Sequence, residues 1–96
     1  MTRTKDNPVA RTYKVQGRVQ GVGFRYFTKQ NAEALGIRGY VRNEDDGGVF
    51  IYAVGDPLAI QRFAGAVRTG PHFSEVRTVE EKEAAVQKFS SFRIEA

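Results

Sequence analysis

The chain has 96 residues, of which 41% are hydrophobic and 11% aromatic; it carries a formal net charge of +4 and contains no cysteine. This length and composition indicate one folded domain and exclude a disordered chain, while the lack of cysteine excludes disulfides and thiolate chemistry. The positive charge favours an anionic partner, but an excess of this size fits a small phosphate as well as a nucleic acid.

Residues 1–10 predict a flexible N-terminal tail because they are polar and contain the pair Asn7-Pro8. The domain then spans residues 11–96. The tail has no hydrophobic stretch and does not resemble a secretory signal. No apolar run in the chain approaches the roughly 20 residues that cross a bilayer. We therefore expect a cytoplasmic protein with no membrane partner.

An alternating pattern over residues 13–19 predicts a first strand with one buried face. Gly21 and Gly23 end that pattern, and residues 24–35 predict a helix. The apolar side chains of this helix recur at three-to-four-residue intervals on one side. Gly36 follows at a position typical of a helix C-cap.

The rest of the chain alternates between strand and helix signals. Asp56-Pro57 is a typical helix start, an N-cap followed by proline at the first helical position. Gly65 inside that helix suggests close packing against the sheet. The predicted elements are strands at 37–43 and 49–54 joined by a turn at 44–48, a helix from Pro57 to Gly70-Pro71, a fourth strand at 73–79, a polar connection at 80–88, and a candidate short edge strand at 89–94.

The resulting order, βαββαβ with a candidate fifth edge strand, predicts an α+β fold. It is the ferredoxin-like split βαβ sandwich, in which two helices cover one face of an antiparallel sheet. In this arrangement the first and second strands run parallel with the third between them, so their C-terminal ends lie at the same edge. The loop at 20–25 follows the first strand and Asn43 closes the second, roughly 10 Å away across two inter-strand spacings.

The junction between the first strand and the first helix suits an anion, because backbone N–H groups and the positive end of the helix dipole point at one spot. Arg25 falls in the first helical turn, where the dipole disfavours a cation unless an anion lies between the guanidinium and the amides. Simpler interpretations stay open for each feature. The glycines fit an ordinary tight turn, Arg25 fits a solvent-exposed arginine, and Asn43 fits a turn former beside a glycine-rich hairpin.

Two segments resemble the signatures of the acylphosphatase family. The run Gly17-x-Val19-Gln20-Gly21-Val22-x-Phe24-Arg25 is similar to the first signature. The run Gly39-Tyr40-Val41-Arg42-Asn43, followed by Gly47, Val49 and Gly55, is similar to the second in residue type and spacing. The resemblance covers nearly the whole chain, including its length and element order.

The resemblance implies hydrolysis of acyl phosphates to a carboxylate and inorganic phosphate by direct attack of water on phosphorus. Arg25 would bind the phosphoryl group and Asn43 would orient the water. The resemblance also implies a phosphate cradle made by the backbone of Gln20, Gly21, Val22, Gly23, Phe24 and Arg25. The partners we expect are the small acyl phosphate and inorganic phosphate as product and inhibitor. We expect no metal, cofactor or nucleic acid, and a monomer. The acyl half of the substrate stays open, with acetyl and carbamoyl phosphate among the candidates.

Other chemistry-bearing side chains favour structural roles. The single histidine, His72, is expected in a surface loop at the opposite edge of the sheet. Asp45 and Asp46 are adjacent in a hairpin, which favours turn formation over acid–base work, and the charges at 80–83 suggest a solvated run. The aromatic candidates for the substrate mouth are Tyr26, Tyr40 and Phe27, with core packing favoured for Phe27.

Two alternative functions stay open. The same fold hosts RNA-binding modules that stack bases on sheet aromatics, and Phe50 and Tyr52 lie on the predicted third strand. Against this, the basic aromatic segment at residues 23–27 falls at a helix start, where it forms no stacking platform. The second alternative is a non-catalytic acylphosphatase-like domain, which the presence of both Arg25 and Asn43 disfavours.

Overall fold

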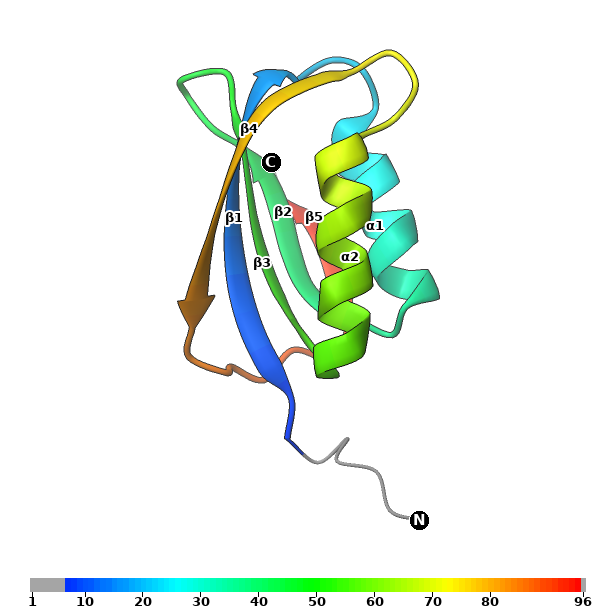
Figure 1. Cartoon of the computed structure of the whole chain (residues 1–96), viewed down its shortest axis with the longest axis vertical. Helices are drawn as coiled ribbons and strands as arrows, with labels where there is room; N and C mark the ends of the chain where they lie inside the picture. The colour runs from blue at the N-terminus through cyan, green and yellow to red at the C-terminus, as the bar shows by residue number, and fades with distance from the viewer. Residues whose placement is uncertain (1–6, 96) are drawn as a thin grey trace.

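The computed structural model describes residues 7–95 of the chain. Its elements occur in the predicted order, with two helices packed on a five-stranded sheet (Figure 1). No helix within those residues is long and apolar enough to cross a membrane. The elements are β1 (Val9–Arg18), α1 (Phe24–Ala34), β2 (Arg38–Asn43), β3 (Val49–Gly55), α2 (Pro57–Thr69), β4 (Glu75–Ala84) and β5 (Phe92–Glu95).

The sheet has the strand order β4-β1-β3-β2-β5, and both helices cover one of its faces (Figure 1). The pairs β1–β3, β1–β4 and β2–β3 are antiparallel, as predicted. β5 instead pairs parallel to β2, so the sheet is mixed and not wholly antiparallel. The reason is the path after β4: the chain passes along the end of the sheet where β2 begins and then runs in the same direction as β2 (Figure 1).

The main core lies between the helices and the sheet. Alternation on β1 buries Tyr13 and Val15, while α2 buries Phe63 against them. The Tyr13 and Phe63 rings meet edge to face at 5.7 Å, and Phe63 meets Phe92 of β5 at 6.1 Å. The predicted start of α2 is confirmed, since the Asp56 side chain accepts from the Leu58 backbone N–H at 3.2 Å. These contacts fix both helices on the sheet.

The opposite face of the sheet is covered by the segment between β4 and β5. The Tyr52 hydroxyl donates to the carbonyl of Ala85 at 2.6 Å and accepts from the N–H of Gln87 at 2.8 Å. Phe89 then packs on Tyr52 with ring centroids 5.4 Å apart, leaving Tyr52 only 4% exposed. Arg42 covers Phe50 at 4.7 Å from the ring centroid. The aromatics that kept RNA binding open are therefore not available as a base-stacking surface.

β4 is longer than the sequence suggested, because it continues through the charged residues expected to form a polar connection. Its partner β1 already begins at Val9, so Val9 and Ala10 belong to the sheet and not to the predicted tail; residues 1–6 of that tail lie outside the described part of the chain. The charged run pairs with β1, and Arg11 of β1 forms an ion pair with Glu81 of the run at 3.8 Å. Opposite charges on facing strands stabilise the pair, so the charged run is a strand whose residues 80–83 remain exposed.

Gly65 faces solvent and does not pack closely on the sheet, which corrects the expectation from its position in the helix. A Cβ added there would meet no atom within 4 Å. Gly39 is the opposite case, because its φ is 140° and an added Cβ would overlap the backbone carbonyl oxygen of Tyr52. The close backbone approach is therefore between β2 and β3.

These two glycines predict opposite effects on stability. Gly65→Ala should raise the free energy of unfolding by about 0.5–1 kcal/mol, because alanine restricts the unfolded chain and suits the helix. Gly39→Ala should lower it by about 2–4 kcal/mol, since strain at positive φ adds to steric overlap. Urea unfolding of both variants measures the difference. Equal effects of the two changes would contradict the packing described here.

Candidate functional site

The loop after β1 and the end of β2 lie at the same end of the sheet (Figure 1). β3 separates the two strands, as the predicted topology requires. The loop leads directly into α1 at Phe24, and Asn43 is the last residue of β2. The geometry on which the predicted site depends is therefore present.

Free backbone amides line the turn into α1. Gly21 and Gly23 have φ values of 74° and 79°, in the left-handed region that favours glycine. Gly23 is the N-cap and provides no side chain to cap the helix; the Phe27 N–H bonds the Gly23 carbonyl at 3.0 Å. In residues 7–95 no protein acceptor takes a hydrogen bond from the N–H groups of residues 21–26. Unsatisfied amides at a helix N-terminus form an anion site.

Arg25 is half-buried beside this turn, and its position is fixed by the last strand. Its Nη1 donates to the Glu95 carbonyl at 3.0 Å. β5 pairs with β2 so that Glu95 faces Arg42 and Ile94 faces Val41. The guanidinium is therefore anchored on one side and does not extend freely into solvent. Sequence reasoning missed this anchor because residues 80–96 carry no motif. The alternation of Phe92, Arg93 and Ile94 indicated a strand but not its contact with Arg25.

Asn43 presents a free acceptor. Its side-chain Oδ1 is buried, and no donor in the described residues reaches it. The turn beside it is closed by other groups: the Glu44 N–H donates to the Gly48 carbonyl at 2.8 Å, and the Gly48 N–H donates to Asp46 Oδ1 at 2.9 Å. The turn does not need the Asn43 side chain, so the turn-former interpretation loses its basis.

A cavity of about 200 Å³ brings most of the predicted site residues together. Its wall includes Arg25 and Asn43, from different elements, and the other six residues around it are on the loop after β1, on α1 or on β5. A larger cavity of about 390 Å³ lies near the start of β1 and α2, and none of the predicted site residues line it. The residues lining the smaller cavity are Val19, Gly21, Gly23, Phe24, Arg25, Tyr26, Asn43 and Ile94.

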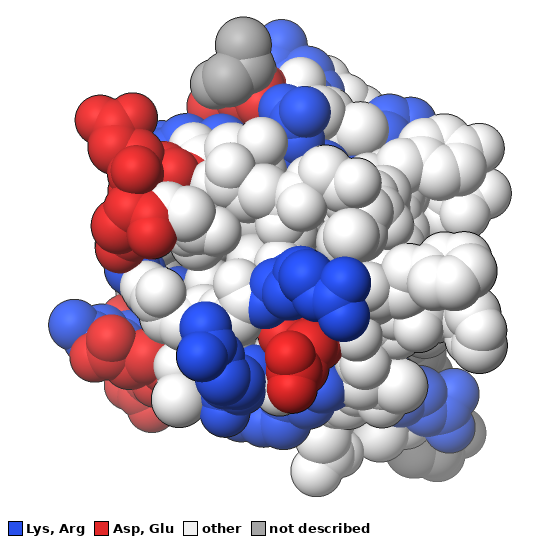
Figure 2. All heavy atoms as spheres, turned by 90° about the horizontal axis from the view of Figure 1, so that it is seen from above, with Lys and Arg blue, Asp and Glu red and all other residues white. Residues whose placement is uncertain are grey.

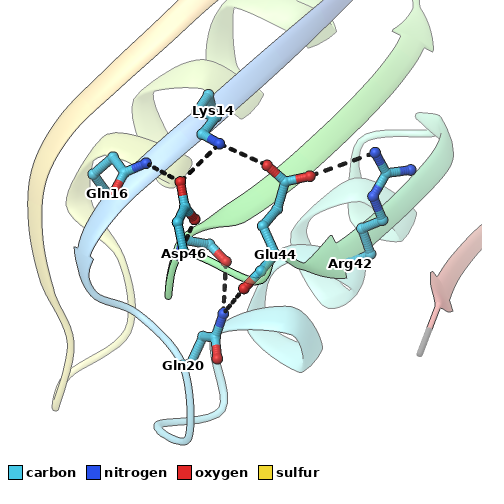
Figure 3. A network of polar contacts seen from close by, with 7 residues as sticks. Lys14, Gln16, Gln20, Arg42, Glu44 and Asp46 are labelled. Atoms are coloured by element: carbon cyan, nitrogen blue, oxygen red, sulfur yellow. Dashed lines mark hydrogen bonds and ion pairs between the residues drawn. The ribbon is translucent and has the colours of Figure 1, made fainter.

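Gln20 and Val22 belong to the predicted cradle but do not line the cavity. The Gln20 side chain links the loop after β1 to the hairpin after β2. Its Nε2 donates to the backbone carbonyls of Glu44 and Gly48, each at 2.8 Å (Figure 3). This bond pair holds the turn after β1 against the hairpin after β2, and thereby fixes the two halves of the site relative to each other.

The hairpin is held from the other side by ion pairs (Figure 3). Lys14 Nζ lies 2.7 Å from Glu44 and 3.0 Å from Asp46, and Arg42 lies 3.4 Å from Glu44. The Gly48 N–H, followed by Lys14 and Gln16, lowers the pKa of Asp46 to about 2. Hydrogen bonds from Lys14 to Glu44 and Asp46 raise the pKa of the Lys14 ammonium. Asp46 thus has the turn-forming role that its sequence position indicated.

The loop that carries His72 lies beside the site and not at the opposite edge. β4 begins where β1 ends, with Glu75 paired to Arg18, and a Cβ on Gly70 would lie 3.4 Å from the Phe24 ring. The loop from α2 therefore returns to the same end of the molecule. His72 itself is exposed, stacks edge-on with Phe73 at 4.7 Å, and does not line the cavity.

The three aromatic candidates for the substrate mouth separate in the structure. Tyr26 lines the cavity. Phe27 packs against Phe24 with ring centroids 6.1 Å apart. Tyr40 lies on the other face of the sheet, stacked on Tyr52 at 5.9 Å. Figure 2 views the molecule from the end that holds the cavity: acidic side chains gather at the left, basic and acidic side chains also lie in the lower middle, and uncharged surface extends to the right.

The chain is similar to known proteins over nearly all of its length. A family model described as Acylphosphatase matches residues 11–94. An acylphosphatase from Archaeoglobus fulgidus is 52% identical over 80 residues, which cover 83% of this chain and 90% of that protein. The crystal structure of an acylphosphatase from Bacillus subtilis has a TM-score of 0.89 at 39% identity, covering 92% of this chain and 99% of that one. The structure of an acylphosphatase from Coxiella burnetii has a TM-score of 0.91 at 33% identity, covering 99% and 100%.

From the low pKa of Asp46 in this hairpin we expect the free energy of unfolding to depend on pH. Because the pKa of Asp46 in the folded protein is about 2, below the 3.8 of a free aspartate, the contribution of its carboxylate to stability is present above pH 4 and is lost as the pH falls toward 2. Asp46→Asn should therefore be less stable than the parent at pH 6, and the difference should shrink by pH 2.5. Urea unfolding at several pH values measures this. Asp45→Asn is the matched control, and a pH dependence equal to that of Asp46→Asn would contradict the assignment.

Proposed function

Because this chain belongs to the acylphosphatase family and hydrolyses acyl phosphates, we propose that the reaction takes place in the cavity between the turn into α1 and the end of β2. One observation carries the proposal. Arg25, the free amides of the turn and the partnerless Oδ1 of Asn43 border the same small space. These groups supply an anion site and a hydrogen-bond acceptor on different sides of it.

In this proposal Arg25 and the backbone amides of residues 20–25 bind the phosphoryl oxygens. A guanidinium stays protonated and donates two parallel N–H bonds to a phosphate. The Glu95 carbonyl occupies Arg25 Nη1, which leaves other N–H groups of the guanidinium for the substrate. Phosphoryl transfer passes through a loose transition state whose charge is spread over the equatorial oxygens. Donors already held in place stabilise that charge without reorganising.

Asn43 orients the attacking water. A carboxamide is a poor base, but its oxygen can accept a hydrogen bond from water and so direct the water lone pair toward phosphorus. The buried Oδ1 of Asn43 has this acceptor capacity free. Its place at the end of β2 is fixed by pairing with Val49. The proposed role is therefore positioning by hydrogen bonding.

The remaining proton transfers need little from the protein. The leaving carboxylate has a conjugate-acid pKa of roughly 4 to 5 and departs at neutral pH without a general acid. No carboxylate or imidazole side chain is among the residues that line the cavity. A phosphoryl oxygen of the substrate, whose second pKa as a phosphate monoester is about 6, can accept the proton of the water.

The proposal also covers inhibition by phosphate, the oligomeric state and the location of the protein. Inorganic phosphate, the product, fits the phosphoryl site and acts as a competitive inhibitor. We further propose a cytoplasmic monomer, in which the acylphosphatase domain begins with β1 at Val9 and not at residue 11. The support for a monomer is that the second face of the sheet is covered by the chain's own segment at Phe89.

Arg25→Ala should lower kcat/KM by about 10³-fold or more, because it removes the cation that stabilises the transferring phosphoryl group. Phosphate release from benzoyl phosphate measures the loss, and the inhibition constant of inorganic phosphate should rise with it. Arg93→Ala is the matched control, an exposed arginine on β5 that does not line the cavity. Retention of activity in Arg25→Ala with the fold intact would refute the site.

Asn43→Ala should lower kcat by about 10²- to 10³-fold, while phosphate inhibition stays close to that of the parent. The split is expected because the residue contacts the water and not the phosphoryl oxygens. Asn43→Asp keeps an acceptor at nearly the same place but adds a negative charge, so it should weaken phosphate binding. The opposite result for Asn43→Ala, weak phosphate binding with normal kcat, would assign the residue to substrate binding.

A further inference from the structure

We infer that Tyr26 and Ile94 form an apolar wall that binds the acyl group and makes the enzyme selective for uncharged, apolar acyl phosphates. The inference rests on the proposed function, because it takes the phosphoryl group to lie at Arg25 and the amides of the turn. It concerns the other half of the substrate, which neither the sequence motifs nor the family membership specifies.

Two exposed apolar side chains line the cavity. Tyr26 is 60% exposed and Ile94 is 40% exposed, and both line the same small space as Arg25 and Asn43. Single exposed apolar residues are ordinary on protein surfaces, whereas a cluster at a concave site indicates ligand contact. Within the described residues only five large hydrophobic side chains are exposed, so two of the five border this one cavity.

The lining of the cavity directs the acyl group toward these two side chains. The volume of the cavity is about 200 Å³. With the phosphoryl group at Arg25 and the amides of the turn, the exposed apolar side chains left for the substituent on the carbonyl are those of Tyr26 and Ile94.

The charge of the lining favours an uncharged substituent. Among the described residues that line the cavity, Arg25 is the one with a cationic side chain, and the phosphoryl group engages it. An acyl group with a second carboxylate or phosphate would find no second cation on this part of the lining.

Both side chains are held in place before substrate arrives. The Tyr26 hydroxyl accepts a hydrogen bond at 3.2 Å from Gln30, one turn further along α1. Ile94 is fixed by its pairing with Val41, and its neighbour Glu95 anchors Arg25. An apolar wall that is already ordered loses little side-chain entropy on binding. Strand β5 thus both anchors Arg25 and carries Ile94 of the acyl site.

The test compares kcat/KM for benzoyl phosphate and acetyl phosphate. Tyr26→Ala and Ile94→Ala should each lower the benzoyl-to-acetyl ratio about tenfold, the effect expected for losing apolar contact with a substrate group. Tyr26→Phe keeps the ring and should keep the ratio. Leu58→Ala removes an exposed apolar side chain that lines the other cavity, and it should also keep the ratio. In the parent enzyme, 4-carboxybenzoyl phosphate should be hydrolysed less efficiently than benzoyl phosphate.

An unchanged ratio in both alanine variants, or an equal loss for both substrates, would overturn the inference. A parent enzyme that prefers the carboxylated substrate would overturn it as well. Arg25→Ala assayed on the same substrates separates this failure from failure of the proposed site. If Arg25→Ala is inactive while the ratio is unchanged in the Tyr26 and Ile94 variants, only the acyl wall is wrong. If Arg25→Ala hydrolyses every substrate normally, the proposed site itself is wrong.

Discussion

The site depends on the pair of hydrogen bonds from the Gln20 side chain to the carbonyls of Glu44 and Gly48. Arg25 and Asn43 come from elements that follow different strands, and β3 lies between those strands. The topology brings both residues to one end of the sheet, and the Gln20 side chain links the two loops directly. Lys14 supports the same hairpin from β1. Preorganised chemistry of this kind requires catalytic groups that move little relative to each other.

Sequence reasoning placed Arg25 and Asn43 at one end of the sheet because motif and topology agreed, and in the structure both residues line one cavity. The glycine turn pointed to an anion site, and the split βαβ order placed Asn43 at the same sheet edge as Arg25. The backbone of Gln20 stays a predicted part of the phosphate cradle. The two hydrogen bonds from its side chain to the hairpin were not predicted, because a contact between two loops leaves no periodic pattern in either segment. The extension of β4 was missed because residues 80–83 are exposed, as the sequence predicted, and only their pairing with β1 shows that they form a strand.

The two faces of the sheet have different covers, and this explains how so short a chain protects its strands. The helices bury Tyr13, Val15 and Phe63 on one side. On the other, Tyr52 holds the segment after β4 through its hydroxyl and packs on Phe89. A small domain buries a limited fraction of its surface, so an irregular segment takes the place of a third layer. That segment also leads into β5, which runs parallel to β2 and places the Glu95 carbonyl where it accepts the hydrogen bond from Arg25.

The anchor of Arg25 lies far from it along the chain, because the carbonyl that accepts from its guanidinium is 70 residues away. Contacts of such separation form only after the intervening chain has been ordered, and they slow folding relative to local contacts. During synthesis, the arginine emerges from the ribosome long before Glu95 does. A nascent chain can therefore assemble the glycine turn and the first helix, yet its guanidinium stays unanchored until the last strand joins the sheet.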